Sequence, residues 1–461
     1  MLRTHRPHQV EWDNSLIKKY NYSGPRYTSY PTALEFSEQF SETEFEQAAA
    51  KYPERDLSLY VHIPFCHKLC YFCGCNKIIT RQTHKVTQYL DTLEKEIISR
   101  SKLFTHRTVT QLHWGGGTPT FLNNQEISRL MQMLKTHFQF ADNAEMSIEV
   151  DPREITLDTI DHLAKEGFNR LSIGIQDFNK QVQQLVNREQ DEAFISALIQ
   201  RARAQHFKSI NLDLIYGLPT QTVESFVYTL NKVIELSPDR LSVFNYAHLP
   251  DRFAAQRKIK DDDLPNAEVK LEILEKTIES LTHVGYRFIG MDHFAKPNDE
   301  LALAQEQGIL HRNFQGYTTQ GNNDLLGLGV SAISMLGDSY AQNQKELKLY
   351  TQAVNEQQHA LWKGFTMSLD DIIRRDVIKQ LICHFRLDKK TIETQYQLDF
   401  EQYFTEDLVL LAQFEQDNLI IMNQDELIVT AKGHLLIRNI CMCFDVYLRR
   451  LARQRQFSRV I

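Results

Sequence analysis

Between residues 57 and 284 the chain alternates between short apolar runs and longer segments with helical apolar spacing. The short runs are rich in β-branched residues and cover 57–63, 109–115, 145–150, 170–175, 210–216 and 240–246. The helical segments between and after them cover 84–97, 124–138, 157–166, 191–206, 223–235 and 266–284. Strand followed by helix, repeated in this way, predicts a parallel sheet with right-handed crossovers. Polar residues and glycines follow the strands, which favours a partial (βα)6 barrel over a doubly wound sheet.

The segments before and after this α/β region have different patterns of apolar and polar residues. Residues 1–50 form a polar extension that contains an extended strap, Asn21–Phe36, in which prolines and a glycine exclude a helix. From about residue 365 the pattern reads helix, hairpin and then one long helix over 431–451. That order predicts a mostly helical, winged-helix-like C-terminal domain. We therefore expect three parts, residues 1–50, 51–364 and 365–461.

Composition and charge narrow the function classes. The 461 residues are 42% hydrophobic and 24% charged, which is ordinary for a globular protein and excludes a disordered or collagen-like chain. A net charge of −7 without a basic run argues against nucleic-acid binding. No apolar run reaches the ~20 residues of a membrane helix, and no secretory leader is visible. We expect a cytoplasmic monomer that does not bind membranes.

Four of the seven cysteines fall within ten residues, directly after the first strand. Cys66, Cys70 and Cys73 form the pattern C-x3-C-x2-C, and Cys75 follows. Three thiolates suit a [4Fe–4S] cluster with one open iron, because iron–sulfur centres take soft sulfur ligands. A structural zinc site, closed by Cys75 or a nearby histidine, is the alternative that the spacing leaves open.

The surroundings of the cysteines resemble the radical S-adenosylmethionine (SAM) superfamily. C-x3-C-x-aromatic-C after the first strand matches its cysteine motif, and WGGGTPT at 114–120 matches its glycine-rich segment. In that family SAM chelates the open iron and is cleaved to a 5′-deoxyadenosyl radical. The resemblance implies that Phe72 lies against SAM. Glycines suit a segment whose backbone must approach a ligand closely.

A closer resemblance covers nearly the whole chain. It is carried by NYSGPRYTSYPTALEF, YVHIPFCHKLCYFCGCNK, HWGGGTPT, SIEVDPRE, GIQDFN, VNREQ, DLIYGLP, VFNYAHLP, QGYTTQG and RNICMCFD. These segments are similar to the oxygen-independent coproporphyrinogen III oxidase family of heme biosynthesis. The resemblance implies conversion of two propionates of coproporphyrinogen III to vinyls, giving protoporphyrinogen IX. It also implies an electron donor for the cluster, a flavodoxin-like or ferredoxin-like protein.

The same resemblance implies two bound SAM molecules and the residues that contact them. The SAM on the cluster would contact Tyr60, Gly116, Glu149 and Ile333. The second would contact Phe72, Gly117, Thr118, Gln176, Arg188, Asp213 and Ala247. It identifies no catalytic side chain. We expect the strap to cover the barrel mouth, with Arg26 binding a propionate and Tyr22, Tyr27 and Tyr30 contacting the macrocycle.

The residues themselves are compatible with this assignment but do not require it. Most of the predicted contacts end or follow strands, where barrel sites form, and the fork of Arg188 suits a carboxylate. Arg188 could equally form an exposed ion pair with Glu189 or Asp191. Two other functions stay open. One is a heme-binding chaperone that keeps the cluster without decarboxylase activity, although such proteins typically lack Cys75. The other is a zinc-stabilised regulator.

Overall fold

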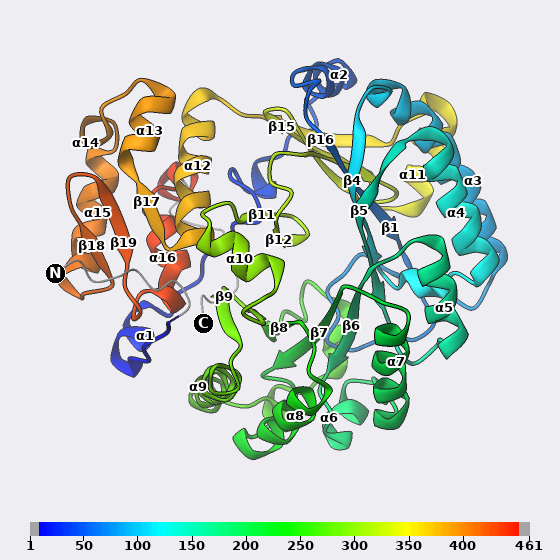
Figure 1. Cartoon of the computed structure of the whole chain (residues 1–461), viewed down its shortest axis with the longest axis horizontal. Helices are drawn as coiled ribbons and strands as arrows, with labels where there is room; N and C mark the ends of the chain where they lie inside the picture. The colour runs from blue at the N-terminus through cyan, green and yellow to red at the C-terminus, as the bar shows by residue number, and fades with distance from the viewer. Residues whose placement is uncertain (1–8, 451–461) are drawn as a thin grey trace. The chain divides into compact units, whose positions relative to one another are not determined.

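The structure is a computed structural model that describes residues 9–450 (Figure 1). The chain divides by its contacts into two compact units. The barrel unit comprises Phe36–Asn266 and Asn322–Thr366, and the second unit takes the described residues within Met1–Glu35, Ala267–Gly321 and Met367–Ile461. This grouping puts 267–321 with the C-terminal segment, whereas the sequence pattern suggested one continuous barrel over 51–364. The three-part division stays a prediction.

The predicted parallel strands form the centre of the barrel unit. They are β1 (Leu57–Ile63), β4 (Thr108–Gly116), β5 (Gln139–Val150), β6 (Arg170–Gln176), β7 (Ser209–Tyr216) and β8 (Arg240–Asn245). Neighbours along the chain pair in parallel throughout this series. The partial barrel predicted from the sequence is therefore confirmed, and the carboxyl ends of all these strands lie at the same edge.

Helices connect these strands as the apolar spacing predicts. They are α3 (His84–Ser101), α4 (Asn124–His137), α5 (Leu157–Glu166), α7 (Glu192–Ala204) and α8 (Val223–Leu236). Figure 1 shows α3, α4, α5 and α7 along one side of the strands. Local chemistry sets the ends: Asn123 and Thr222 begin α4 and α8 with capping boxes, and Gly167 ends α5 in a left-handed conformation. The predicted sixth helix, α9 (Ala267–His283), belongs by its contacts to the second unit.

Further strands extend the sheet beyond β1. β13 (Asp324–Leu328) pairs in parallel with β1, and β14 (Ile333–Leu336), β15 (Ser339–Asn343) and β16 (Leu361–Thr366) continue it in antiparallel fashion. The short β2 (Phe65–Cys66) pairs with β3 (Ile78–Ile79) and so closes the cysteine loop at its base. The unit also contains α2 (Glu42–Ala50), α6 (Lys180–Leu185) and α11 (Leu347–Gln357).

The second unit contains the winged-helix-like arrangement that the C-terminal pattern predicts. Its small sheet has the order β17-β19-β18, built from Arg386–Asp388, Glu426–Val429 and Ile420–Met422. The helices around it are α12 (Leu369–His384), α13 (Lys389–Tyr396), α14 (Phe400–Tyr403) and α15 (Thr405–Gln416). The unit also holds α1 (Asn14–Tyr20), β9 (Arg287–Gly290), β10 (His293–Ala295), α10 (Glu300–Glu306), β11 (His311–Asn313) and β12 (Gly316–Thr318).

The prediction of one long helix over 431–451 is wrong. The chain forms a short 3-10 turn and then two separate helices, α16 (Ile437–Met442) and α17 (Val446–Arg450). Asp445 lies between them, and its carboxylate accepts the backbone N–H groups of Tyr447 and Leu448 at 3.0 and 3.2 Å. A carboxylate that bonds the backbone in this way begins a new helix instead of continuing the old one.

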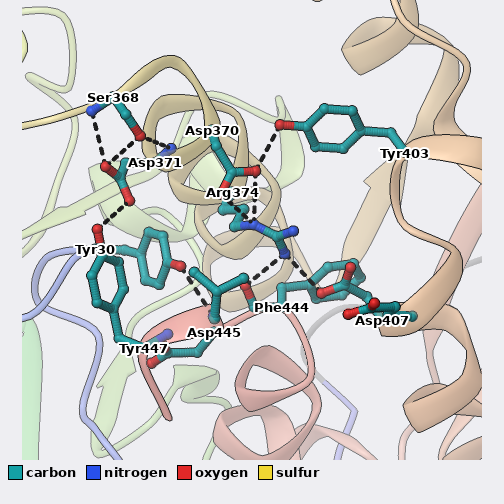
Figure 2. A network of polar contacts seen from close by, with 12 residues as sticks. Tyr30, Ser368, Asp370, Asp371, Arg374, Tyr403, Asp407, Phe444, Asp445 and Tyr447 are labelled. Atoms are coloured by element: carbon teal, nitrogen blue, oxygen red, sulfur yellow. Dashed lines mark hydrogen bonds and ion pairs between the residues drawn. The ribbon is translucent and has the colours of Figure 1, made fainter. Parts of the chain in front are cut away.

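Residues 21–35 of the strap belong to the second unit, whereas Phe36 belongs to the barrel unit. The Tyr27 hydroxyl donates to Asp445 at 3.0 Å, and the Tyr30 hydroxyl accepts the N–H of Val446 at 3.3 Å. Figure 2 shows Tyr30 beside Tyr447, whose hydroxyl donates to Asp371 at 2.8 Å. Both strap rings are at most 4% exposed, so in this structure they serve as packing residues of the second unit.

Among residues 9–450, no helix has both the length and the apolar content needed to cross a membrane.

Candidate active site

The three predicted ligand cysteines lie in the loop that follows β1. Cys66 and Cys70 are buried and Cys73 is half-buried, whereas Cys75 is exposed. The backbone holds the loop at two points, because Thr80 N–H donates to the Cys66 carbonyl at 3.1 Å and Tyr71 N–H to the Val186 carbonyl at 3.0 Å. The loop is therefore fixed at its base and at its middle.

The thiols influence one another electrostatically. Burial, together with the charges of Cys73 and Cys70, raises the pKa of Cys66 to about 11. A hydrogen bond with Cys75 lowers the pKa of Cys73 and raises that of Cys75. The charges of Cys70 and Cys73 thus both act on the Cys66 thiol.

The donor set fits the predicted cluster. Within residues 9–450, no group of three or more His, Cys, Asp and Glu side chains is arranged to hold one metal ion. A [4Fe–4S] cluster makes a different demand, because each thiolate binds its own iron and the sulfurs stand apart around the cluster. Three soft thiols on one short loop meet that demand.

Two arginines donate to the sulfur of Cys70. Arg153 Nη2 and Arg188 Nη1 each lie 3.3 Å from Cys70 Sγ. Both guanidinium groups also bind Asp151, at 2.6 Å for Arg153 and 3.2 Å for Arg188. These two cations keep the pKa of Asp151 well below its usual range, although burial acts in the opposite direction. The cluster of charges supplies positive potential where an anionic iron–sulfur centre would sit.

Sequence reasoning missed two members of this charge cluster, Asp151 and Arg153. Both lie in the segment DPRE directly after β5, at a strand end where barrel site residues are expected. Their position after a predicted strand could have identified Asp151 and Arg153 as candidate site residues from the sequence. Their pairing with Arg188, which lies after β6, is visible only once the chain is folded.

Arg188 itself is buried, with 6% of its surface exposed. The alternative of an exposed ion pair with Glu189 or Asp191 is therefore wrong. Its Nη2 donates to the Gly174 carbonyl at 2.5 Å, but its buried Nε has no hydrogen-bond partner within residues 9–450. A buried guanidinium N–H without an acceptor is costly, so this atom is a donor available to a bound ligand.

Gln176 and Arg188 come together over Gly174. A Cβ at Gly174 would lie 2.7 Å from Gln176 Nε2 and 2.9 Å from Arg188 Nη2, so glycine is required there. Gln176 ends β6 with a φ of +67°, which turns its side chain out of the strand register. Two residues predicted to contact the second SAM are thus adjacent.

The glycines of WGGGTPT are required by the protein itself. Gly116 has a φ of +116°, and a Cβ there would lie 2.5 Å from the His62 ring. A Cβ at Gly117 would lie 2.6 Å from the Pro64 carbonyl oxygen. Thr118 then donates to Cys66 Sγ at 3.3 Å. The segment packs directly on the base of the cysteine loop, which gives a structural reason for glycine beside the predicted ligand contact.

Tyr60, in the middle of β1, and Glu149, near the end of β5, belong to one polar group. Tyr60 bonds His62 Nδ1 at 3.0 Å and stacks on His113, with ring centroids 6.0 Å apart. His113 Nε2 lies 3.5 Å from Glu149, and Gly116 N–H donates to the same carboxylate at 3.1 Å. Burial would raise the pKa of Glu149, but these two partners outweigh it and lower the pKa. Glu149 is therefore an anion, suited to an ammonium group or to ribose hydroxyls.

Ile333 packs against a glycine of β13, the strand beside β1. Gly327 of β13 lies opposite Tyr60 of β1, and a Cβ at Gly327 would lie 2.6 Å from the Ile333 carbonyl oxygen. The absence of a side chain there lets the Ile333 backbone pack against β13, the strand that pairs with β1. Of the four residues predicted for the cluster-bound SAM, Tyr60, Gly116 and Glu149 thus share one polar group, and Ile333 lies against the neighbouring strand.

The remaining predicted contacts lie further along the strand ends. Gln256 Nε2 donates to the carbonyls of Phe72 and Ala247, at 2.9 and 3.3 Å, and so ties the cysteine loop to the end of β8. Asp213 in β7 accepts from Ser172 and Asn211, at 3.0 and 2.8 Å. Burial, with the charge of Glu149, raises the pKa of Asp213 to about 6.

Comparison with known proteins agrees with this geometry. Residues 60–233 match the Radical SAM superfamily, and residues 367–436 match the HemN C-terminal domain. An oxygen-independent coproporphyrinogen III oxidase from Escherichia coli is 69% identical over 98% of this chain and 99% of its own length. The chain belongs to the oxygen-independent coproporphyrinogen III oxidase family.

More distant members of the oxygen-independent coproporphyrinogen III oxidase family align just as completely. The relative from Pseudomonas aeruginosa is 51% identical over 98% of this chain and 99% of its own length. A solved structure of coproporphyrinogen III oxidase from Escherichia coli, described as a radical SAM enzyme, superposes with a TM-score of 0.93 at 68% identity. It covers 95% of this chain and 100% of that one. The fold class and family predicted from the sequence are confirmed.

Proposed function

We propose that this chain is a radical SAM enzyme of heme biosynthesis that converts two propionates of coproporphyrinogen III to vinyls, without oxygen, and yields protoporphyrinogen IX. The observation that carries the proposal is the 69% identity to a curated oxidase over nearly the full length of both chains. The cysteine loop, the glycine segment and the strand-end polar residues all fall within that aligned length.

Cys66, Cys70 and Cys73 hold the [4Fe–4S] cluster in this proposal, and Cys75 is not a ligand. When bound, the cluster and SAM supply the 5′-deoxyadenosyl radical, which can remove an unactivated hydrogen that no ordinary base can take. Arg153 and Arg188 place positive charge beside Cys70. Thr118 donates to Cys66 and orients the first thiolate.

Two SAM molecules bind, and each propionate conversion consumes one. Tyr60, Gly116, Glu149 and Ile333 contact the SAM on the cluster. Phe72, Gly117, Thr118, Gln176, Arg188, Asp213 and Ala247 contact the second. The unpartnered Nε of Arg188 supports a carboxylate at the second site, because a guanidinium binds a carboxylate with charge-assisted hydrogen bonds.

The proposal includes a flavodoxin-like or ferredoxin-like electron donor, a monomeric state, a cytoplasmic location and no membrane or nucleic-acid partner. The net charge of −7 supports the last of these. The heme-binding chaperone is the weaker candidate, because Cys75 is present and the relatives reported above are named as oxidases.

The deciding experiment is an anaerobic assay with coproporphyrinogen III, SAM and a chemical reductant. We expect protoporphyrinogen IX together with two 5′-deoxyadenosines per product. A Cys73→Ser variant is the matched control and should form neither product. One 5′-deoxyadenosine per two vinyl groups would contradict the use of two SAM molecules. Tight heme binding without SAM cleavage would favour the chaperone.

A further inference from the structure

Arg312 in the second unit is a cation without a counter-ion in the described part of the chain. It lies in β11, directly across the hairpin from Tyr317 of β12, and its guanidinium lies 4.7 Å from the centre of the Tyr317 ring. Its Nε and Nη1 are buried and have no hydrogen-bond partner. Among residues 9–450, no carboxylate forms an ion pair with it. Arg312 as a whole is only half-buried, so a ligand can reach it.

The charges that act on the residue before Arg312 are mostly positive. Burial lowers the pKa of His311 to about 3, and the charges of Lys379 and His384 add to this effect, while Asp376 acts in the opposite direction. The charge of Arg26 also lowers the pKa of Tyr317 against the effect of burial. Arg26, however, already forms an ion pair with Asp292. The arginine that we expected to bind a propionate is therefore neutralised within its own unit, and Arg312 is not.

The hairpin holds Arg312 in place. The Tyr317 hydroxyl donates to the Ile382 carbonyl at 3.0 Å, and the ring lies edge-on to His293 at 5.2 Å. Gly321 permits the end of the segment to pack on His311, since a Cβ there would lie 1.7 Å from the His311 ring. The guanidinium thus rests on a fixed aromatic surface.

Burying guanidinium N–H groups without acceptors costs free energy, and the stacking on Tyr317 recovers only part of it. An anion at this position would supply both the missing charge and the missing acceptors. A carboxylate matches the fork geometry of arginine. The substrate in the proposed function carries four propionates, so carboxylates are the anions that it would bring.

We propose that Arg312 binds a propionate carboxylate of the tetrapyrrole substrate, at a subsite that lies wholly within the second unit. This inference rests on the proposed function. Arg312 is a binding residue here, and it takes no part in holding the cluster, whose predicted ligands all lie in the barrel unit.

The test compares Arg312→Gln with Arg386→Gln in the cluster-loaded enzyme. Arg386 belongs to the same unit but is exposed and paired with Glu426 at 2.5 Å, so its variant should behave as wild type. The measurement is an anaerobic titration with coproporphyrin III and with its tetraamide, which keeps the ring and removes the four charges. We expect Arg312→Gln to bind the acid about 10- to 100-fold more weakly and the tetraamide about as well as wild type.

Thermal unfolding separates binding from packing. Removing a buried charge that has no partner should leave the unfolding temperature unchanged or raise it. Coproporphyrin III should stabilise the wild type and Arg386→Gln more than Arg312→Gln. Unchanged acid binding in Arg312→Gln would overturn the proposal. A large stability loss in both Arg312→Gln and Arg312→Met would also overturn it, by making Arg312 a packing residue.

Turnover distinguishes this proposal from the proposed function. In Arg312→Gln, the KM for coproporphyrinogen III should rise while iron content and substrate-free SAM cleavage stay at wild-type values. If the wild type neither binds coproporphyrin III nor converts coproporphyrinogen III, the proposed function fails. If the wild type does both and Arg312→Gln equals it, only the Arg312 subsite fails. Equal competition by millimolar acetate in both proteins would show a non-specific anion effect and overturn the subsite.

Discussion

Replacing Arg188 by alanine tests the proposed second SAM site. The change removes contacts with Asp151 at 3.2 Å, Cys70 Sγ at 3.3 Å and the Gly174 carbonyl at 2.5 Å. Asp151 keeps its ion pair with Arg153 at 2.6 Å, so no buried carboxylate is left alone. We therefore expect a stability loss of about 2–3 kcal/mol, below the ~3–5 kcal/mol that follows when a buried charge is stranded.

The effect on ligand binding comes from the unpartnered Nε of Arg188. A hydrogen bond from a charged donor is worth about 1.5–3 kcal/mol, so the second SAM should bind about 10- to 150-fold more weakly. The SAM on the cluster should bind normally. The cluster should also remain, because Arg153 still donates to Cys70.

The assay measures iron and sulfide content, SAM binding at two sites, and vinyl formation, all without oxygen. Arg201→Ala is the matched control, since Arg201 lies on α7 in an exposed pair with Asp161 at 2.5 Å and should change little. Full activity with both SAM sites intact in Arg188→Ala would refute the reasoning. Loss of the iron would instead assign Arg188 to the cluster.

Three further predictions follow from single sites. Serine in place of any one of the three proposed cluster thiols should abolish the broad absorbance near about 400 nm, whereas Cys75→Ser should keep it; the opposite pattern would reverse the ligand assignment. The pKa of Asp213 is raised from 3.8 to about 6, so its protonated form stabilises the folded state in acid and this contribution is lost as the pH rises through about 6. Asp213→Asn should therefore flatten the pH dependence of the unfolding temperature across that window, and an unchanged slope would contradict it. The buried Glu96 accepts from Gly329 N–H, Asn343 and Tyr350 at 2.6–2.8 Å, so Glu96→Ala should lower the unfolding free energy by about 3–5 kcal/mol in a denaturant titration. A loss below about 1 kcal/mol would show that these donors find other partners.

The order and type of the central elements were predictable because they depend on local patterns. β1 runs over Leu57–Ile63, as its apolar run predicts, and α5 runs over Leu157–Glu166, as its spacing predicts. The prediction was wrong where a side chain competes with the backbone. Asp445 divides the predicted helix over 431–451, and hydropathy gives no weight to a carboxylate that bonds backbone N–H groups.

The sequence alone determined the cysteine loop, the glycine segment and the family, because spacing along the chain carries that information. Only the tertiary structure decided which charges meet. Arg188, predicted as a possible surface residue, is buried against Asp151 and Cys70, while Arg26 pairs with Asp292 and Arg312 with no acid among residues 9–450. Charge pairing joins residues that lie far apart along the chain, and its strength depends on burial. The spacing of residues along the chain gives neither the distance between two charged side chains nor their burial. These pairings could therefore be identified only in the folded chain.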